Sequence, residues 1–465
     1  MVDEVTIRFV RNVREVSFDE IQPEAIQRTK IAILDIVAVS LAAFNSEIST
    51  KVRATVGAWG GRQDSRIFFT QSRLPAHNAA LVNATISRVL DFDDTFELAP
   101  NGAHASAYIV PTALALVDRD PSLSGKDLLT AVAVASDLYC RTSRSIRANA
   151  VDTGRDNGSA VFGTTAAAMR LMRLDERQCL NAFGIAYAQS AGEFQMYEEA
   201  SQTVSLQQGL RARSGIESAE LASAGFDGPK EALYGRYGFF RAFEPTHDLD
   251  LLMGKLGIDF VARELSYKPF PCCKCMHPAI SATLKLRKDN NIDPAEIKSI
   301  RIGTNRICKD FLAKPEDLKW NPPTMVAAKF SLPFGVAVAA AKGAVGILDF
   351  EGEALRHRDV LRLLAATSVE VDADIERTDG MNQNAPAKIY FKLGDGKEIS
   401  QRIDHPLGHP RNPPSMEDVV GKLAQCASYS SLELSQARLD NIREAVSSLE
   451  TMTSARSLMD LICER

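Results

Sequence analysis

The sequence predicts a mainly α-helical protein, with a large all-helical domain and a smaller α+β lid domain. Apolar residues recur at helical spacing, among many alanines, through residues 1–263. Strand-like alternation and a hairpin pattern are found between residues 264 and 403. A chain of 465 residues is too long for one ordinary core. Because the helical pattern returns in residues 404–465, we expect this tail to pack back on the first domain.

The helices of the first domain are indicated by their ends as well as by their periodicity. Pro23 lies just inside the start of an apolar-periodic segment, where its fixed φ is favourable. Ser124-Gly125-Lys126-Asp127 opens another helix, DLLTAVAVASDLYCRTSRSI, whose alanines permit close helix contacts. Residues 161–171 and 176–191 read as a helical pair joined by a short loop, and residues 206–224 read as a further helix. About eight helices are expected before residue 260.

The lid combines helices with a hairpin. Its elements are expected to be a helix at 277–288, a strand at 296–304, a helix at 325–345 interrupted at Pro333, and a hairpin of strands at 387–393 and 397–403. The hairpin turns at Gly394-Asp395-Gly396. A Pro-rich link at 405–414 leads to tail helices at 416–426 and 432–446.

Composition narrows the class of protein. The 45% hydrophobic and 24% charged content is typical of a soluble globular chain. A net charge of −5 without a basic run argues against nucleic acid as a partner. No apolar stretch reaches membrane-spanning length, and the N-terminus lacks a signal-peptide core. Eight cysteines without regular spacing suggest free thiols in a reducing compartment, so we expect a cytoplasmic protein with no membrane partner.

The most informative stretch is LDFDDT, which follows an apolar helical segment and precedes a histidine. Carboxylates at the end of a buried helix are costly to desolvate, so they need partners or a function. If the helix continues through Thr95, then Asp91, Asp94 and Thr95 share one face. A turn at residues 100–102 would return His104 to that face. The alternative interpretation is a solvated helix end with an incidental histidine.

Two of the seven histidines are candidates for acid–base chemistry, because imidazole titrates near neutral pH. His104 follows the acidic cluster, and His277 follows the loop KPFPCCKCM. Loop lysines are usually solvated, but Lys268 and Lys274, which flank the prolines before this histidine, lie beside it and could bind a carboxylate.

No metal or organic cofactor is predicted. The pattern CCxCxH lacks the paired spacing of a zinc site, and buried thiols are the preferred interpretation. The sequence has no phosphate-binding glycine loop and no G-x-S-x-G motif. The interpretation that remains for a catalytic site is acid–base chemistry without a cofactor.

Several segments in the same order resemble the MmgE/PrpD family, which contains 2-methylcitrate dehydratase, cis-aconitate decarboxylase and iminodisuccinate epimerase. They are LDFDDT with His104 and Pro111, SGIESAELASAGFDGP at 214–229, KPFPCCKCMHPAI at 268–280 and AAKFSLPFGVAVA at 327–339. The resemblance covers nearly the whole chain. It implies a helical domain completed by the C-terminal tail, an α+β lid, a homodimer, and an active site between domain and lid.

The resemblance also implies site residues. The family's motif aspartate and threonine fall on Asp91 and Thr95, and its two histidines fall on His104 and His277. We expect the histidines to be the acid–base pair, Asp91 to orient His104 or a water, and Thr95 to donate a hydrogen bond. Lys268 and Lys274, with Asp94 beside them, would form the substrate-binding set.

The chain departs from the family pattern at three places. Val204 and Gln207 stand where decarboxylase-like members have a lysine and often a histidine, and residues 154–157, including Asp156, stand near a common family histidine. The spacing from Thr95 to His104 is about three residues longer than usual. Fewer cations argue against decarboxylation of a tricarboxylate.

The resemblance therefore implies a lyase that acts on a small polycarboxylate, most simply a hydro-lyase of the 2-methylcitrate dehydratase type. An epimerase of the iminodisuccinate epimerase type and a carboxy-lyase of the cis-aconitate decarboxylase type are alternatives. A binding dimer without catalysis is a further alternative.

Overall fold

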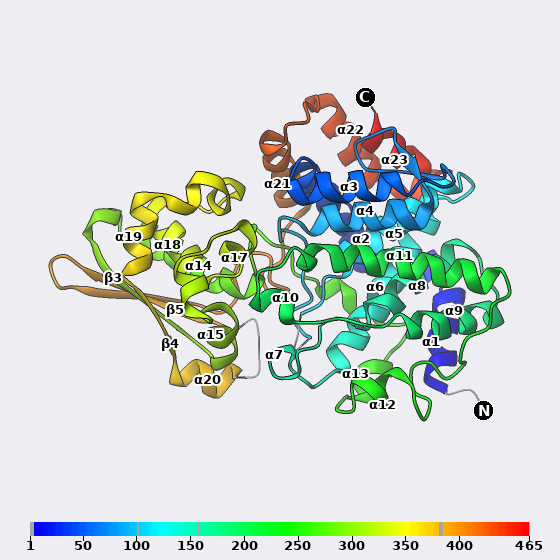
Figure 1. The fold of residues 1–465 in the computed structure, drawn as a ribbon, viewed down its shortest axis with the longest axis horizontal. Coiled ribbons are helices and arrows are strands. Elements are labelled where there is room, and N and C mark those ends of the chain that lie inside the picture. Colours follow the sequence, from blue (N-terminus) through cyan, green and yellow to red (C-terminus); the bar gives the residue numbers. More distant parts are fainter. Residues whose placement is uncertain (1–3, 100–101, 157, 381–384, 465) are drawn as a thin grey trace.

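The computed structural model describes residues 4–99, 102–156, 158–380 and 385–464. It is mainly helical, with a smaller part built on a sheet, as the sequence predicted (Figure 1). The helices and the short hairpin of the first part are α1 Glu4–Glu15, α2 Pro23–Ala43, α3 Glu47–Ala58, β1 Ser65–Arg66, β2 Arg73–Leu74, α4 Ala76–Arg88, α5 Ala105–Arg119, α6 Gly125–Ser145, α7 Ala150–Thr153, α8 Ala160–Leu171, α9 Glu176–Ala188, α10 Gln195–Glu198, α11 Thr203–Ser223, α12 Phe239–Phe243 and α13 Leu249–Met253.

The remaining elements form the sheet-containing part and the tail. They are α14 His277–Asp289, β3 Ile297–Thr304, α15 Arg306–Leu312, α16 Glu316–Trp320, α17 Met325–Lys329, α18 Leu332–Lys342, α19 Arg358–Ala365, β4 Thr367–Val371, α20 Ala373–Asp379, β5 Ala387–Leu393, β6 Glu398–Ile403, α21 Met416–Tyr429, α22 Gln436–Ser447 and α23 Arg456–Cys463.

Helix α2 is the centre of the first hydrophobic core. Pro23 occupies its first turn, as expected, and nearly every side chain from Ala25 onwards is buried. Helices α4, α5 and α6 pack on it, and so do α21 and α22 of the C-terminal tail. In Figure 1 the tail lies over the N-terminal helices, far from the sheet. The tail therefore contributes its apolar side chains to the first core.

The second hydrophobic core lies on a four-stranded sheet of order β4-β3-β5-β6. The predicted hairpin is present as antiparallel β5 and β6, and β3 pairs antiparallel with β5. Strand β4 was not predicted, and it pairs parallel with β3. Alternate residues of β5 (Ala387, Ile389, Phe391) are buried, and helix α14 packs on β5 and β6.

Some local predictions need correction. The segment expected as one interrupted helix at 325–345 forms two, α17 and α18, because Pro333 takes the first turn of a new helix. In the described residues, thirteen helices begin before residue 260, rather than about eight, and α7, α10, α12 and α13 are only four or five residues long. Met196, Tyr197 and Val204 pack in the second core, although they come from the first part of the chain.

The predicted continuation of the buried helix through Thr95 is wrong. Helix α4 ends at Arg88, and Asp91 adopts a left-handed φ of +51°, which no helix can include. Thr95 instead forms an isolated antiparallel bridge with Ser266. Phe96 N donates to Ala103 O at 2.7 Å, which brings His104 back beside this bridge, while residues 100–101 of the predicted turn lie outside the described residues.

Two further features concern the thiols and the long helices. All eight cysteines are buried, and none of them forms a disulfide bond in the described residues. In the described part of the chain, no single helix has the length and apolar character to cross a membrane, and α2 and α3, which pass that test only as a pair, meet at a 95° bend.

The tail is anchored by a buried ion pair, and this gives a stability prediction. Lys422 Nζ donates to Asp35 Oδ1 at 2.7 Å and to Phe92 O at 2.5 Å. Lys422→Ala would leave the Asp35 carboxyl buried without its cation, so we expect the free energy of unfolding to fall by about 3–5 kcal/mol. Urea denaturation measures it. Lys397→Ala, at an exposed hairpin turn, is the control, and a loss below about 1 kcal/mol for Lys422→Ala would contradict the expectation.

Candidate active site

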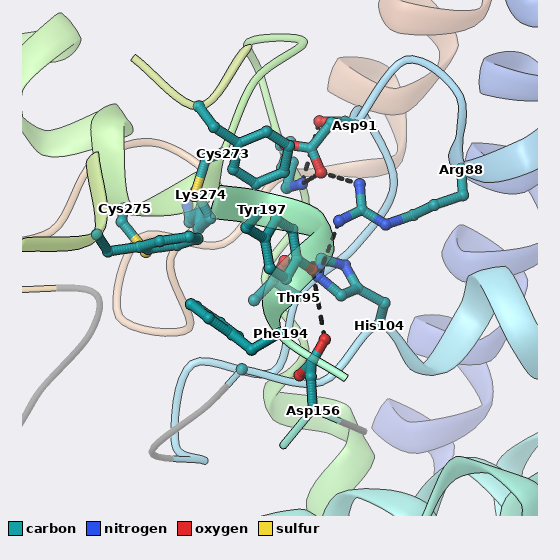
Figure 2. A pocket seen from close by; sticks show the side chains of 14 residues that line it. Arg88, Asp91, Thr95, His104, Asp156, Phe194, Tyr197, Cys273, Lys274 and Cys275 are labelled. Atoms are coloured by element: carbon teal, nitrogen blue, oxygen red, sulfur yellow. Dashed lines mark hydrogen bonds and ion pairs between the residues drawn. The ribbon is translucent and has the colours of Figure 1, made fainter. Parts of the chain in front are cut away.

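A cavity opens where the two hydrophobic cores meet (Figure 2). It contains about 400 Å³ of space not filled by protein atoms, part of it open to solvent. Its walls come from the end of α4, the loop to α5, the segment 268–275 and aromatic side chains near α10, α15 and α17. The lining residues are Arg88, Asp91, Thr95, Gly102, His104, Asp156, Phe194, Tyr197, Lys268, Cys273, Lys274, Cys275, Phe311 and Phe330.

Arg88 is the central cation of this cavity. Its side chain is only 1% exposed. The guanidinium forms an ion pair with Asp91 and another with Asp93, the latter at 3.3 Å between Nη1 and Oδ1. In the amide orientation that satisfies both groups, Gln208 accepts from Arg88 Nε at 3.2 Å. Arg88 Nη2 lies 3.3 Å from His104 Nε2. Each of the three guanidinium nitrogens therefore has a polar partner.

His104 is held in one tautomer by these neighbours. Its Nδ1 lies 2.8 Å from Asp94 O and 3.0 Å from Asp93 Oδ2, both acceptors. Since arginine only donates, Nε2 must accept from Arg88, and the proton is on Nδ1. Burial and the charge of Arg88 lower the pKa of His104 to about 4, although Asp93 opposes this shift. The ring is therefore neutral at pH 7, with its lone pair on Nε2.

Lys268 supplies a second cation. Its Nζ donates to Asp91 Oδ1 at 2.9 Å and to Asp91 O at 3.0 Å. The Thr95–Ser266 bridge holds this segment against the loop after α4. Burial lowers the pKa of Lys268 to about 8, against the attraction of Asp93. Burial also acts to raise the pKa of Asp93, but Arg88, His104 and Lys268 outweigh it and keep that carboxyl ionised.

Lys274 lines the cavity beside a third carboxyl group. Its Nζ lies 3.3 Å from Glu97 Oε1, and both side chains are at most 5% exposed. Burial lowers the pKa of the Lys274 amine, with Glu97 opposing. Glu97 also accepts from Ser266, and His409 Nε2 lies 3.9 Å from its other oxygen. The positive charge of Lys274 is thus partly compensated by Glu97 before a substrate binds.

The structure brings together Asp91, Thr95, His104, Lys268 and Lys274, but it separates two other predicted residues from them. Among the described residues that line the cavity, His277 and Asp94 are absent. His277 is fully buried at the start of α14; its Nε2 donates to Cys272 O at 3.2 Å, and Nδ1 has no hydrogen-bond partner among the described residues.

Asp94 does not line the cavity, and its carboxyl group is instead hydrogen-bonded to Ser106. Its carboxyl group accepts from Ser106 N at 3.2 Å and from Ser106 Oγ at 2.5 Å, at the start of α5. Burial and the nearby Asp93 raise the pKa of Asp94 well above its ordinary value. Asp91 was predicted to orient His104 or a water, and the carboxyl group in contact with the His104 ring is that of Asp93.

Sequence reasoning missed Arg88, Asp93 and the aromatic wall. Arg88 carried a signal, because a lone arginine inside an apolar-periodic helix is costly to bury without partners. The aromatic wall carried none, because Phe194, Tyr197, Phe311 and Phe330 are spread over more than a hundred residues. Their rings nevertheless pack together, with Tyr197 and Phe330 centroids 4.8 Å apart.

Comparison with known proteins gives one consistent result. The MmgE/PrpD N-terminal domain matches residues 8–252, and the MmgE/PrpD C-terminal domain matches residues 270–449. The human cis-aconitate decarboxylase is 26% identical over 99% of this chain and 95% of its own length. The cis-aconitate decarboxylase of Aspergillus terreus (strain NIH 2624 / FGSC A1156) is 22% identical over 98% of this chain and 96% of its own length.

The geometry around His104 predicts its titration. We expect His104 to remain the neutral Nδ1–H tautomer from pH 8 down to about 5 and to take up a proton near its pKa of about 4. Asp93→Asn should lower that pKa further, because Asp93 favours the charged ring. Imidazole ¹⁵N chemical shifts measure both, with His104→Gln used to assign the signal. A His104 that titrates at or above 6.5 would contradict the geometry.

Proposed function

The chain belongs to the MmgE/PrpD family, whose relatives named above are lyases, and on this premise we propose that it is a cofactor-independent lyase for a small polycarboxylate. The reaction takes place at a carbon next to a carboxylate. Its type is that of a hydro-lyase of the 2-methylcitrate dehydratase kind, in which a proton and a hydroxyl group leave neighbouring carbons and an alkene forms.

The observation that carries this proposal is the neutral His104. A ring with its proton fixed on Nδ1 by Asp93 and Asp94 O can act as a base only through Nε2, and it does so once the substrate draws Arg88 Nη2 away from that nitrogen. Dehydration needs such a base to remove the proton next to a carboxylate. Decarboxylation does not need a base at this position, because its carbanion forms when carbon dioxide leaves. A bound substrate carboxylate would raise the pKa of His104 and so increase its basicity.

Other residues of the cavity can supply the proton donor, the cations and the hydrogen-bond donor that the reaction also needs. Lys268, with a pKa of about 8, is charged near neutral pH and is a better proton donor than an ordinary lysine, so it can protonate the leaving hydroxyl group. Arg88 and Lys274 are the cations that can attract the spectator carboxylates. Thr95, whose Oγ1 is 3.4 Å from His104 Nδ1, can donate a hydrogen bond to the substrate.

A substrate panel tests the reaction type. Citrate, 2-methylcitrate, malate, cis-aconitate and iminodisuccinate are incubated with the enzyme in deuterated water and followed by NMR. We expect an alkene from a hydroxy acid, without carbon dioxide and without added metal. Carbon dioxide release would favour the reaction named for the relatives, and deuterium uptake without a new product would indicate an epimerase. Binding without any turnover would indicate a site that has lost catalysis.

Substitution of the two histidines tests the assignment of the base. His104→Asn should lower kcat by about a hundredfold or more, because it removes a positioned base. His277→Asn should lower kcat by less than about tenfold, since His277 lies outside the cavity wall. Both are compared at matched thermal stability. Equal losses in the two variants would favour a mechanism in which both histidines touch the substrate after the lid moves.

A further inference from the structure

Asp156 is a carboxyl group on the cavity wall that the mechanism above does not use. Its side chain lies at the opposite end of the labelled residues from Asp91 in Figure 2, with His104 and Tyr197 between them. The residue is only 3% exposed. Tyr197 Oη and Gln207 Nε2 both donate to its Oδ2, each at 3.4 Å. These two donors are neutral, and the buried guanidinium of Arg211 also interacts electrostatically with Asp156.

The backbone around Asp156 is built to hold it there. Phe194 N donates to Gly154 O at 2.9 Å, which ties the segment to the start of α10. A Cβ at Gly192 would lie 1.6 Å from Asp156 O, so the two chains approach as closely as only glycine allows. Asp156 therefore has a fixed position at the end of the cavity, and is not part of a solvated loop.

The charges of the cavity limit what it can bind. Among the described residues that line it or pair with its lining, Arg88, Lys268 and Lys274 are cationic, while Asp91, Asp93, Glu97 and Asp156 carry carboxyl groups. Each cation already contacts a carboxyl group of the chain. A third substrate carboxylate at the Asp156 end would face like charge in a buried setting, where such repulsion is strong.

We propose that Asp156 determines substrate specificity: it accepts a hydrogen bond from a hydroxyl or ammonium group of a dicarboxylate and excludes a third carboxylate. This inference rests on the proposed function for its site, and it narrows the substrate class to hydroxy- or amino-dicarboxylates. Gln207 and Tyr197 hold the Asp156 carboxyl in place, and the cations at the Arg88 end attract the two carboxylates.

Calorimetric binding to three probes tests it: malate and aspartate, each a dicarboxylate with one added donor, and propane-1,2,3-tricarboxylate, which lacks one. Wild-type protein should bind malate and aspartate at least about tenfold more tightly than the tricarboxylate. Asp156→Asn, which is nearly isosteric, should weaken the binding of aspartate by about tenfold or more and strengthen the binding of the tricarboxylate. Asp152→Asn, four residues earlier and exposed, is the matched control and should change neither.

The outcomes separate this inference from the proposed reaction. Tighter binding of the tricarboxylate by wild-type protein, no binding of malate or aspartate, or an equal change for all three probes in Asp156→Asn would overturn the role of Asp156. If the expected order of affinities holds but no hydroxy acid is dehydrated, the proposed reaction fails and the specificity role stands.

Discussion

The buried guanidinium of Arg88 is the constraint on which the site depends. An arginine cannot lose its charge, and an unpaired charge in the interior costs several kcal/mol, so each of its donors needs an acceptor. Asp91 and Asp93 meet this need only if the chain leaves the helix directly after Arg88, which it does. The remaining donor, Nη2, meets His104, and this contact fixes which ring nitrogen lacks a proton. One buried charge thus sets the path of the chain and the chemical state of the base.

The same short segment is held from three distant parts of the chain. Lys329 of the second core donates to Val89 O at 3.4 Å, Lys268 of the connecting segment to Asp91 O, and Lys422 of the C-terminal tail to Phe92 O. Carbonyl groups beyond a helix end lack helical partners, and ammonium groups satisfy them well. The left-handed Asp91 is stable because these contacts determine its conformation from outside. The position of the acidic residues therefore depends on the packing of both cores and the tail.

This dependence explains what the sequence could and could not predict. The hairpin at 387–403, helix α14 and the Pro23 helix start follow from local periodicity and turn residues, and all are present. The return of His104 to the acidic cluster was also predicted, and contacts with Asp93 and Asp94 O confirm the approach. The helix through Thr95 was wrong because spacing at i and i+4 cannot detect lysines that arrive from residues 268, 329 and 422. The aromatic wall and Asp156 depend on tertiary packing in the same way.

The electrostatic state of the site also depends on its enclosure. Burial is the largest cause that lowers the pKa of both His104 and Lys268, and the aromatic wall of Phe194, Tyr197, Phe311 and Phe330 provides part of that burial. These rings join α10, from the first part of the chain, to the second core. If the two cores separated to admit a substrate, water would reach His104 and its pKa would rise towards the ordinary value. The ring would still be mostly neutral at pH 7, because the ordinary pKa of histidine is about 6.5, and closure would remove this water again. Enclosure of the substrate would exclude water from the site, which protects a carbanion-like intermediate from protonation by water.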